Sequence, residues 1–554
     1  MRISRSWYFR PAPWSGPAFS CRTAVVAACV GLVLGFGVCS DKVVSAEIGP
    51  PAGAAAAEVT ADPKWLREAL EQVPASARDD PAAIDQLRIH RSRDERDDGI
   101  WTSADLVHLA RFPGLKDLTI GGWGFAPDAL GQLKKLERLE RINMLPSLTD
   151  EDLKSLAGLP ALKSLVLWEA ARLTETGMKC LSESKSLGEI DITHVPDTTI
   201  VRPLGGMKDL KVLRIGVWPV TEAEMRAIAE LKGPAALDLR LGVPIKEKPA
   251  DVLKPLRGMA NVEALRLARW PLNDAAVEAV STLNNLKRLD LEEAKIADAH
   301  MAYVARLANL RELNLSGTAI ADAGVAYLRN LVALQKLDLG RTKITDKGLL
   351  ALRSLVNLEV LNLKGTQLTD AGTSVLPKFT RLKELYLAST KVGDTTADYV
   401  GQIASLRTLT LREASVTTAG MSLLARLKNL EVLNLSDCSG VNDEGLVFIG
   451  EITSLRELDL GKSFGAAIAD SRGVIHLNPR TGRPFRPYPP ITDRGVAHLR
   501  NLRNLRKLNL VKTDVTREGV LKALKDLEGL EVTFTGQLFR EYETLTVGGD
   551  AANP

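Results

Sequence analysis

Catalysis or metal binding would require histidine, cysteine or carboxylate side chains at particular spacings, and the sequence contains no such motif. The six histidines are His90, His108, His194, His300, His476 and His498. No two of them stand at a metal-ligand spacing such as H-E-x-x-H. No G-x-S-x-G elbow, P-loop or dinucleotide fingerprint is present. We therefore expect no metal, no cofactor and no catalytic residue, so the chain is not predicted to be an enzyme.

One polar position, set between two leucine-type residues, recurs along the chain. Its early members alternate in sign: Asp191, Arg214, Asp238, Arg266 and then Asp290. We predict a partner-binding strip at this position, or else a ladder that satisfies itself, because neighbours in a sheet lie about 4.8 Å apart. The candidate contact residues are Asp290, Asn314, Asp338, Asn362, Tyr386, Asn434 and Asp459.

Three tryptophans share a second position, at the rim where strand becomes turn. Trp123, Trp218 and Trp270 stand where later repeats have threonine, and Trp168 lies two places earlier in its repeat. Tryptophan is enriched at binding hot spots, so we predict an aromatic patch for protein or glycan contact. Irregular filling of the core is the alternative.

Residues 463–490 interrupt the pattern with an excess of about 26 residues. Insertions in repeat proteins map to loops, often on the binding face. We predict an ordered contact loop, with an unstructured insertion as the alternative. Its candidate contact residues are Arg480, Arg483, Phe485, Arg486 and Tyr488.

These positions are set by a repeat. The segment L-x-x-L-x-L starts at seven leucines spaced 24 residues apart, from Leu286 to Leu430, with looser copies on both sides. Within a copy such as 310–318, leucines alternate with polar residues, which predicts a strand with one buried face. A helical pattern follows, as in 344–355. About 18 such units cover residues 84–535.

A single unit cannot bury its leucines, so stacking must do it. Strands then pair in parallel on a concave face, and helices cover the convex face. The helices need more width than the strands, so the stack curves. The fold class predicted is an α/β solenoid. Thr345 or Asp346, and the equivalent pairs, cap each helix, and a glycine two residues later is expected to let helix and sheet approach closely.

The whole pattern, L-x-x-L-x-L-x-x-T-x-I-T-D-x-G-L, resembles the leucine-rich-repeat superfamily. The T-D-x-G-L stretch is most similar to the ribonuclease-inhibitor-like and cysteine-containing repeats. The column that holds Cys or Asn in those relatives is mostly threonine here, with Cys438 the exception. No F-box is visible, and the chain resembles exported bacterial repeat proteins. The resemblance implies partner binding on the concave face.

The termini differ from the repeats. Residues 1–46 combine a basic start, an apolar run at 23–39 and the small-residue site Val44-Ser45-Ala46, which predicts a secretory signal peptide. An uncut membrane anchor and a lipid-bearing Cys39 are the alternatives. Residues 47–61 read as a flexible spacer and 62–83 as a capping helix. Residues 536–554 are expected to be a disordered tail.

The net charge limits which classes of partner the protein is expected to bind. The leader holds five basic residues and one acidic residue, and removing them leaves 67 of each. We therefore do not predict sequence-independent electrostatic binding to nucleic acid. We expect an exported protein, periplasmic, secreted or on the cell surface, that binds a protein partner through its concave face and rim loop. The alternatives are a self-associating envelope component and a carbohydrate-binding or carbohydrate-active protein.

Overall fold

The computed structural model describes most of the chain from Pro63 onward, within one compact unit that spans Asp62–Pro554. The described ranges are 63–73, 80–91, 99–145, 148–168, 170, 172–195, 197–217, 220–231, 236–242, 247–438, 440–462, 491–535 and 542–547. The predicted leader and spacer lie outside them. No helix in these ranges is both long enough and apolar enough to cross a membrane.

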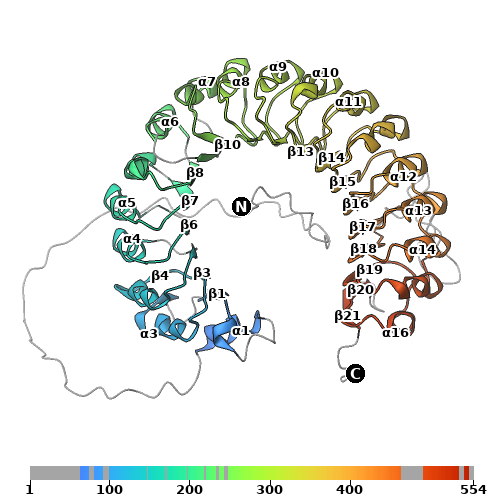
Figure 1. The fold of residues 1–554 in the computed structure, drawn as a ribbon, viewed down its shortest axis with the longest axis horizontal. Helices are drawn as coiled ribbons and strands as arrows, with labels where there is room; N and C mark the ends of the chain where they lie inside the picture. The colour runs from blue at the N-terminus through green and yellow to red at the C-terminus, as the bar shows by residue number, and fades with distance from the viewer. Residues whose placement is uncertain are drawn as a thin grey trace, which may run out of the picture. The chain divides into compact units, whose positions relative to one another are not determined.

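A single sheet lines the inner side of the unit (Figure 1). In the described ranges it contains 19 strands, of which all but the last pair in parallel with their sequence neighbours. The parallel strands are β1 (Gln86–His90), β3 (Asp117–Gly121), β5 (Arg141–Met144), β6 (Ser164–Leu167), β7 (Glu189–Val195), β8 (Val212–Val217), β9 (Ala236–Leu241), β10 (Val262–Arg266), β11 (Arg288–Asp290), β12 (Glu312–Asn314), β13 (Lys336–Asp338), β14 (Val360–Asn362), β15 (Glu384–Tyr386), β16 (Thr408–Thr410), β17 (Val432–Asn434), β18 (Glu457–Asp459), β19 (Lys507–Asn509) and β20 (Glu531–Thr535).

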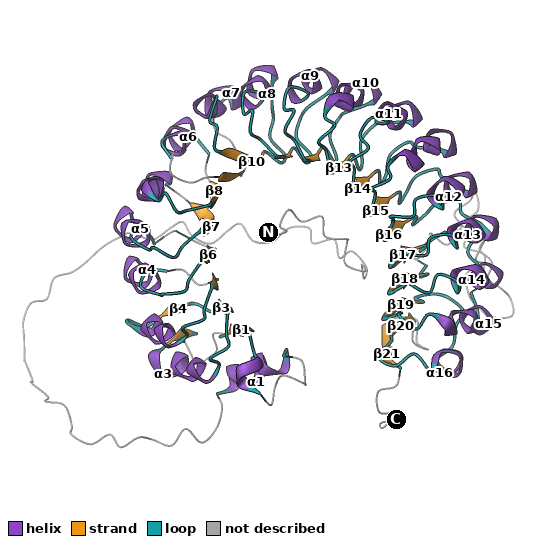
Figure 2. Cartoon of the chain, viewed as in Figure 1, coloured by secondary structure: helices purple, strands orange, loops and turns teal. Residues whose placement is uncertain are grey.

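Short helices form the outer layer (Figure 2). The α-helices are α1 (Lys64–Glu71), α3 (Ser103–Leu106), α4 (Asp150–Ala157), α5 (Glu175–Ser182), α6 (Glu222–Ala229), α7 (Pro249–Leu253), α8 (Asp274–Val280), α9 (Met301–Val304), α10 (Asp322–Val325), α11 (Asp346–Ala351), α12 (Asp394–Val400), α13 (Thr418–Leu424), α14 (Asp443–Ile449), α15 (Asp493–Val496) and α16 (Arg517–Leu524). Others are 3-10 helices: η1 (Pro81–Ala83), η2 (Val107–Arg111), η3 (Ala129–Lys135), η4 (Thr198–Gly206), η5 (Lys254–Leu256), η6 (Asp298–His300), η7 (Ala326–Asn330), η8 (Asp370–Lys378) and η9 (Ala497–Asn501). The α/β solenoid predicted from the repeat is confirmed.

The core lies between the two layers and runs through the described part of the unit. In one repeat, Leu310, Leu313 and Leu315 are all fully buried, and the same three positions are buried in the next repeat. Fully burying a leucine stabilises the fold by roughly 2–3 kcal/mol relative to an exposed one. Since each repeat's leucines pack on its neighbours, this burial requires the stack.

The turn after β13 is built from two side chains, and several other repeats use one or both of the same contacts. The Oδ1 atom of Asp338 accepts the backbone N–H of Gly340 at 2.8 Å, and the Thr342 hydroxyl donates to the carbonyl of Leu339 at 2.6 Å. Between them, Arg341 adopts a φ of 56°. The same left-handed position recurs as Glu293, Gly317, Gly365, Ser389, Glu413, Asp437 and Lys512. The threonine column therefore closes turns through a buried hydroxyl.

A second ladder joins the helix starts of neighbouring repeats. The Asp322 carboxylate accepts the backbone N–H of Thr345 at 2.8 Å and its hydroxyl at 2.6 Å. The same contact joins Asp346 to Thr369. In each pair the aspartate stands in one repeat and the threonine in the next, so this carboxylate bridges repeats. Thr345 caps its own helix by accepting from the N–H of Lys347 at 3.4 Å.

The glycine of the T-D-x-G stretch makes room for that carboxylate. A Cβ added at Gly372 would lie 2.5 Å from Oδ1 and 2.7 Å from Cα of Asp346. A Cβ at Gly348 would lie 2.5 Å from Oδ1 of Asp322. The expectation that this glycine lets helix and sheet approach is wrong, because the close neighbour is the aspartate at the preceding helix start.

Both ends of the described unit have elements outside the repeat. At the N-terminal end, α1 buries Trp65 and Leu66, and the Trp65 ring meets the Trp101 ring edge-on at 5.0 Å. Trp101 belongs to β2 (Ile100–Trp101), which pairs with β4 (Gly124–Phe125). At the other end, β21 (Tyr542–Thr546) pairs antiparallel with β20. The prediction of a disordered tail from 536 is therefore wrong for 542–546, because this strand continues the sheet by covering its last edge.

Candidate functional site

The polar strip lies on the concave face, as successive neighbours across the sheet. Asp290, Asn314, Asp338 and Asn362 pair in register from β11 to β14, and Tyr386, Asn434 and Asp459 continue the row to β18. We call it the central row. Its aspartates are almost entirely buried between their neighbours, whereas its asparagines and Tyr386 keep part of their surface exposed.

Most of the hydrogen-bonding capacity of the central row is used within the chain. Asn314 Oδ1 accepts the N–H of Ser316, and Asn434 Oδ1 accepts that of Ser436. Hydrogen bonds also join residues of the row on neighbouring strands: the Asn362 amide donates to Asp338 at 2.9 Å. The Asn434 amide donates to Asp459 at 3.0 Å, and the Tyr386 hydroxyl to Glu384 at 2.7 Å. These contacts are those of a self-satisfied ladder, and the asparagines and Tyr386 also keep part of their surface exposed.

The early part of the predicted strip belongs to another row. Between β9 and β10 the register shifts, so Asp238 pairs with Ala264, and Arg240 pairs with Arg266. Asp191, Arg214 and Asp238 therefore do not alternate with Arg266 and Asp290, as the leucine pattern suggested. The cause is this irregular pairing, which displaces the motif by two residues at one strand boundary.

Asp238 sits in a charged cluster made possible by that shift. Because Ala264 is small, Arg288 reaches over it and lies 3.3 Å from Asp238. Arg214 approaches the same carboxylate at 3.8 Å, and Arg240 binds Asp191 through two hydrogen bonds of 3.0 and 3.2 Å. Burial raises the pKa of Asp191 above its usual value. These contacts join side chains of β7, β8, β9 and β11, so the cluster links four strands.

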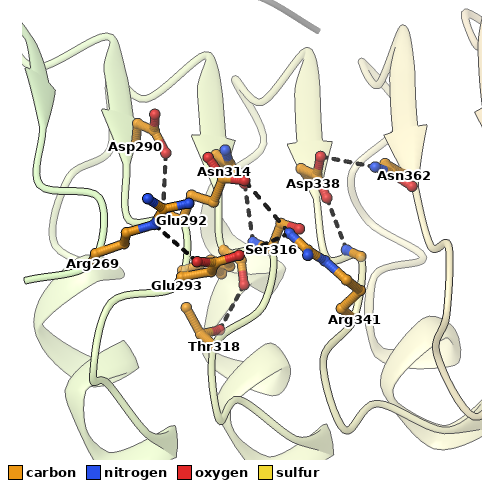
Figure 3. A network of polar contacts seen from close by, with 12 residues as sticks. Arg269, Asp290, Glu292, Glu293, Asn314, Ser316, Thr318, Asp338, Arg341 and Asn362 are labelled. Atoms are coloured by element: carbon orange, nitrogen blue, oxygen red, sulfur yellow. Dashed lines mark hydrogen bonds and ion pairs between the residues drawn. The ribbon is translucent and has the colours of Figure 1, made fainter. Parts of the chain in front are cut away.

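A second charged cluster occupies the rim beside the central row (Figure 3). Arg341 lies 3.3 Å from Glu293 and 3.5 Å from Glu292, and Arg269 lies 2.9 Å from Glu293. Glu293 and Arg341 meet across Gly317, where a Cβ would lie 2.8 Å from Cγ of Glu293. Arg341 keeps 55% of its side chain exposed. This rim therefore presents cations and carboxylates that an incoming surface can contact.

Burial perturbs two carboxyl groups of the central row strongly. It raises the pKa of Asp338 to about 6, although the Gly340 N–H and the Asn362 amide favour the ionised form. Burial also raises the pKa of Asp459 to about 6, although the Gly461 N–H favours the ionised form. Desolvation exceeds hydrogen bonding at both sites because the flanking strands exclude water.

The sequence profile of the family described as leucine-rich repeat region matches residues 267–465. Residues 267–465 are a leucine-rich-repeat region. No curated protein sequence matches it. Among solved structures, an internalin of Listeria monocytogenes is 18% identical, with 67% of this chain and 93% of that chain covered and a TM-score of 0.35.

Two other solved structures are also similar to the chain. A leucine-rich-repeat protein of Leptospira interrogans is 17% identical over 83% of this chain and 97% of its own, with a TM-score of 0.35. TLR13, in a complex with single-stranded RNA, is 20% identical over 76% of this chain and 62% of its own, with a TM-score of 0.41. These likenesses concern the fold alone.

The tryptophans of the predicted aromatic patch lie in different environments in the structure. Trp123 is 62% exposed at the rim, whereas Trp270 is fully buried and donates its indole N–H to the carbonyl of Leu241 at 3.1 Å. Trp270 is therefore excluded from a surface patch, because it fills the core at the register shift. Trp218 lies outside the described residues. Trp168, which the column pattern left out, is 45% exposed on the concave side.

The rim-loop residues Arg480, Arg483, Phe485, Arg486 and Tyr488 lie outside the described residues. Within the described ranges, no cluster of His, Cys, Asp or Glu is arranged to hold a metal ion.

Cys438 is buried, its thiol donates to the Leu411 carbonyl at 3.0 Å, and burial raises its pKa to about 12. Its thiol is therefore a core group at neutral pH.

Proposed function

We propose that this leucine-rich-repeat protein is an exported binding protein that holds a protein partner on its concave face. One observation carries the proposal: the central row and its rim form a continuous, regularly spaced polar surface over the strands β11 to β18. Such a surface offers many weak contacts at a fixed spacing, which suits a macromolecular partner.

The chemistry of this surface supports a protein partner. Arg266 and Arg341 keep 46% and 55% of their side chains exposed although each is ion-paired. Asn314 and Asn362, in the central row, also keep part of their surface exposed. Arginine is enriched at protein interfaces, where exposed charges steer association more than they add affinity.

The insertion adds a second contact to the proposal. In the sequence Gly340-Arg341-Thr342-Lys343-Ile344, two residues separate Arg341 from the buried isoleucine. In the insertion repeat, residues 463–490 stand between Lys462 and Ile491 instead. We propose that the rim-loop residues within this segment contact the same partner. Export is proposed from the leader and is tested by N-terminal sequencing, for which a start at Glu47 is expected.

A matched pair of substitutions tests the concave face. Thr410 lies in the row between Tyr386 and Asn434, and Thr380 is exposed in the turn between η8 and β15. Thr410→Arg places a long cation within the central row, whereas Thr380→Arg places it in a turn outside that row. Affinity capture with mass spectrometry is expected to recover the same partner with the wild type and Thr380→Arg. Thr410→Arg is expected to lose it, and a partner retained by Thr410→Arg contradicts the proposal.

A further inference from the structure

The N-terminal end of the concave face differs from the central row in having apolar side chains. The ladder extends one residue past β5 and β6: the N–H of Leu145 donates to Ile120 and that of Trp168 donates to Met144. Leu145 and Trp168 are therefore neighbours across the sheet, and both follow a buried residue, so both side chains lie on the concave face.

His90 and Val166 complete this patch. A Cβ placed on Gly121 would lie 2.5 Å from Cδ2 of His90 and 3.3 Å from Cδ1 of Leu145, so those two side chains meet over the glycine. Val166, in β6, is partly exposed two residues before Trp168. We name His90, Leu145, Val166 and Trp168 the N-terminal patch.

Trp168 is held in one orientation. Its indole N–H donates to Oδ1 of Asn143 at 2.8 Å. The bond fixes the ring while 45% of the residue stays exposed. Trp65, Trp101 and Trp270 are buried, whereas Trp123 and Trp168 are exposed. An aromatic ring that is already ordered loses little entropy on binding, which is a property of hot-spot residues.

A cation stands at the far end of the patch. Arg88 is exposed on β1, and its guanidinium makes no hydrogen bond or ion pair with another residue in the described part of the chain. Its neighbours Thr119 and Asn143 are uncharged and in register with it. Three strand-to-strand steps, roughly 14 Å, separate the strands of Arg88 and Trp168. About four residues of extended chain cover that distance.

We infer that the N-terminal patch is the anchor site for the protein partner and binds an extended segment of it. The segment places an aromatic or aliphatic side chain against Trp168 and a carboxylate, about four residues away, on Arg88. The inference rests on the proposed function and adds the chemistry of the bound segment. The charge is complementary because Arg141 is ion-paired with Asp117 at 3.1 Å, which leaves the positive charge of Arg88 to attract a carboxylate.

A library of random dodecapeptides displayed on phage tests the inference with the whole protein as the bait. We expect the selected peptides to contain Trp, Phe or Leu with Asp or Glu about four residues away. Trp168→Ala is expected to weaken their binding at least about tenfold. Asn143→Ala, which keeps the Trp168 ring but removes the hydrogen bond that orients it, is expected to give a smaller loss of binding. Arg88→Glu is expected to remove the preference for acidic peptides.

Tyr327 provides the matched control. It is 46% exposed, within one per cent of Trp168, but lies in η7 of the outer layer. Tyr327→Ala is expected to bind the selected peptides as the wild type does. The inference is overturned if no peptide is selected, or if Trp168→Ala binds the peptides unchanged. It is also overturned if only oligosaccharides on a glycan array bind in a Trp168-dependent way.

The captured partner separates this inference from the proposed function. A partner lost by Thr410→Arg but retained by Trp168→Ala leaves the concave-face function intact and removes the anchor site. A wild-type protein that captures no partner contradicts the function itself.

Discussion

Thr492 is hydrogen-bonded to Asp443 across 49 residues of sequence. The backbone N–H and the hydroxyl of Thr492 donate to the two carboxylate oxygens at 2.7 and 2.6 Å. Contacts of the same kind join Asp322 to Thr345 over 23 residues. On the inner side, β18 pairs directly with β19. The repeat contacts on both sides of residues 463–490 are therefore those of an uninterrupted solenoid.

Excision of the insertion follows from that contact. Replacing residues 463–490 by Thr-Lys restores the length seen at Thr342-Lys343. We expect the fold to persist and the free energy of unfolding not to fall, since a shorter connection costs less closure entropy. Urea denaturation followed by circular dichroism measures this. A lower unfolding midpoint would show that the segment supports the stack, and partner capture with the same variant tests its binding role.

Gly372→Ala is expected to destabilise the protein by about 2–4 kcal/mol. The new methyl group would collide with the backbone and carboxylate of Asp346 and so break its two hydrogen bonds to Thr369. Gly131→Ala is the control, because a Cβ there meets nothing within 4 Å. Chemical denaturation of both variants decides the point, and equal stabilities would show that the Asp346 contact contributes little.

Thr342→Val removes the hydroxyl that closes one turn while keeping the side-chain volume. The buried carbonyl of Leu339 then loses its donor, so we expect a loss of about 1–2 kcal/mol. Thr342→Ser keeps the donor and is expected to cost less. Comparing the unfolding free energies of the two variants measures the hydroxyl separately from the methyl group. The reverse order of stability would mean that packing dominates at this turn.

The central row predicts an unusual dependence of stability on pH. Asp338 and Asp459 have a pKa of about 6 in the folded chain, above the value of 3.8 for an ordinary aspartate. Between these values the native state binds protons that the unfolded state has released. Their contribution is therefore complete below pH 3.8 and is lost as pH rises through 6. Each carboxyl accounts for at most about 3 kcal/mol.

Unfolding free energies at pH 4.5 and 7.5 test this contribution. Asp338→Asn keeps an acceptor for the Gly340 N–H and removes the titrating group, so the difference between the two pH values is expected to shrink. Asp398→Asn is the control, because Asp398 is an exposed residue on the outer layer. A pH difference that Asp338→Asn leaves unchanged would place the titration elsewhere.

The repeat by itself determined the fold class. Leucines at a fixed 24-residue interval, with period-two and helical patterns inside each unit, require parallel strands on one side and helices on the other. The row from Asp290 to Asp459 also followed from spacing alone, because consecutive repeats of nearly equal length keep the same register. These features repeat in every unit, so they can be read locally.

Tertiary structure decided the contacts that depend on two repeats at once. The register shift before Ala264 moved Asp238 into another row, and packing buried Trp270 while leaving Trp168 exposed. The partner of Asp322 proved to be Thr345 of the next repeat. A one-dimensional pattern specifies which residues face inward. It does not specify how far neighbouring units slide along each other, because that offset is set by the packing of the whole stack.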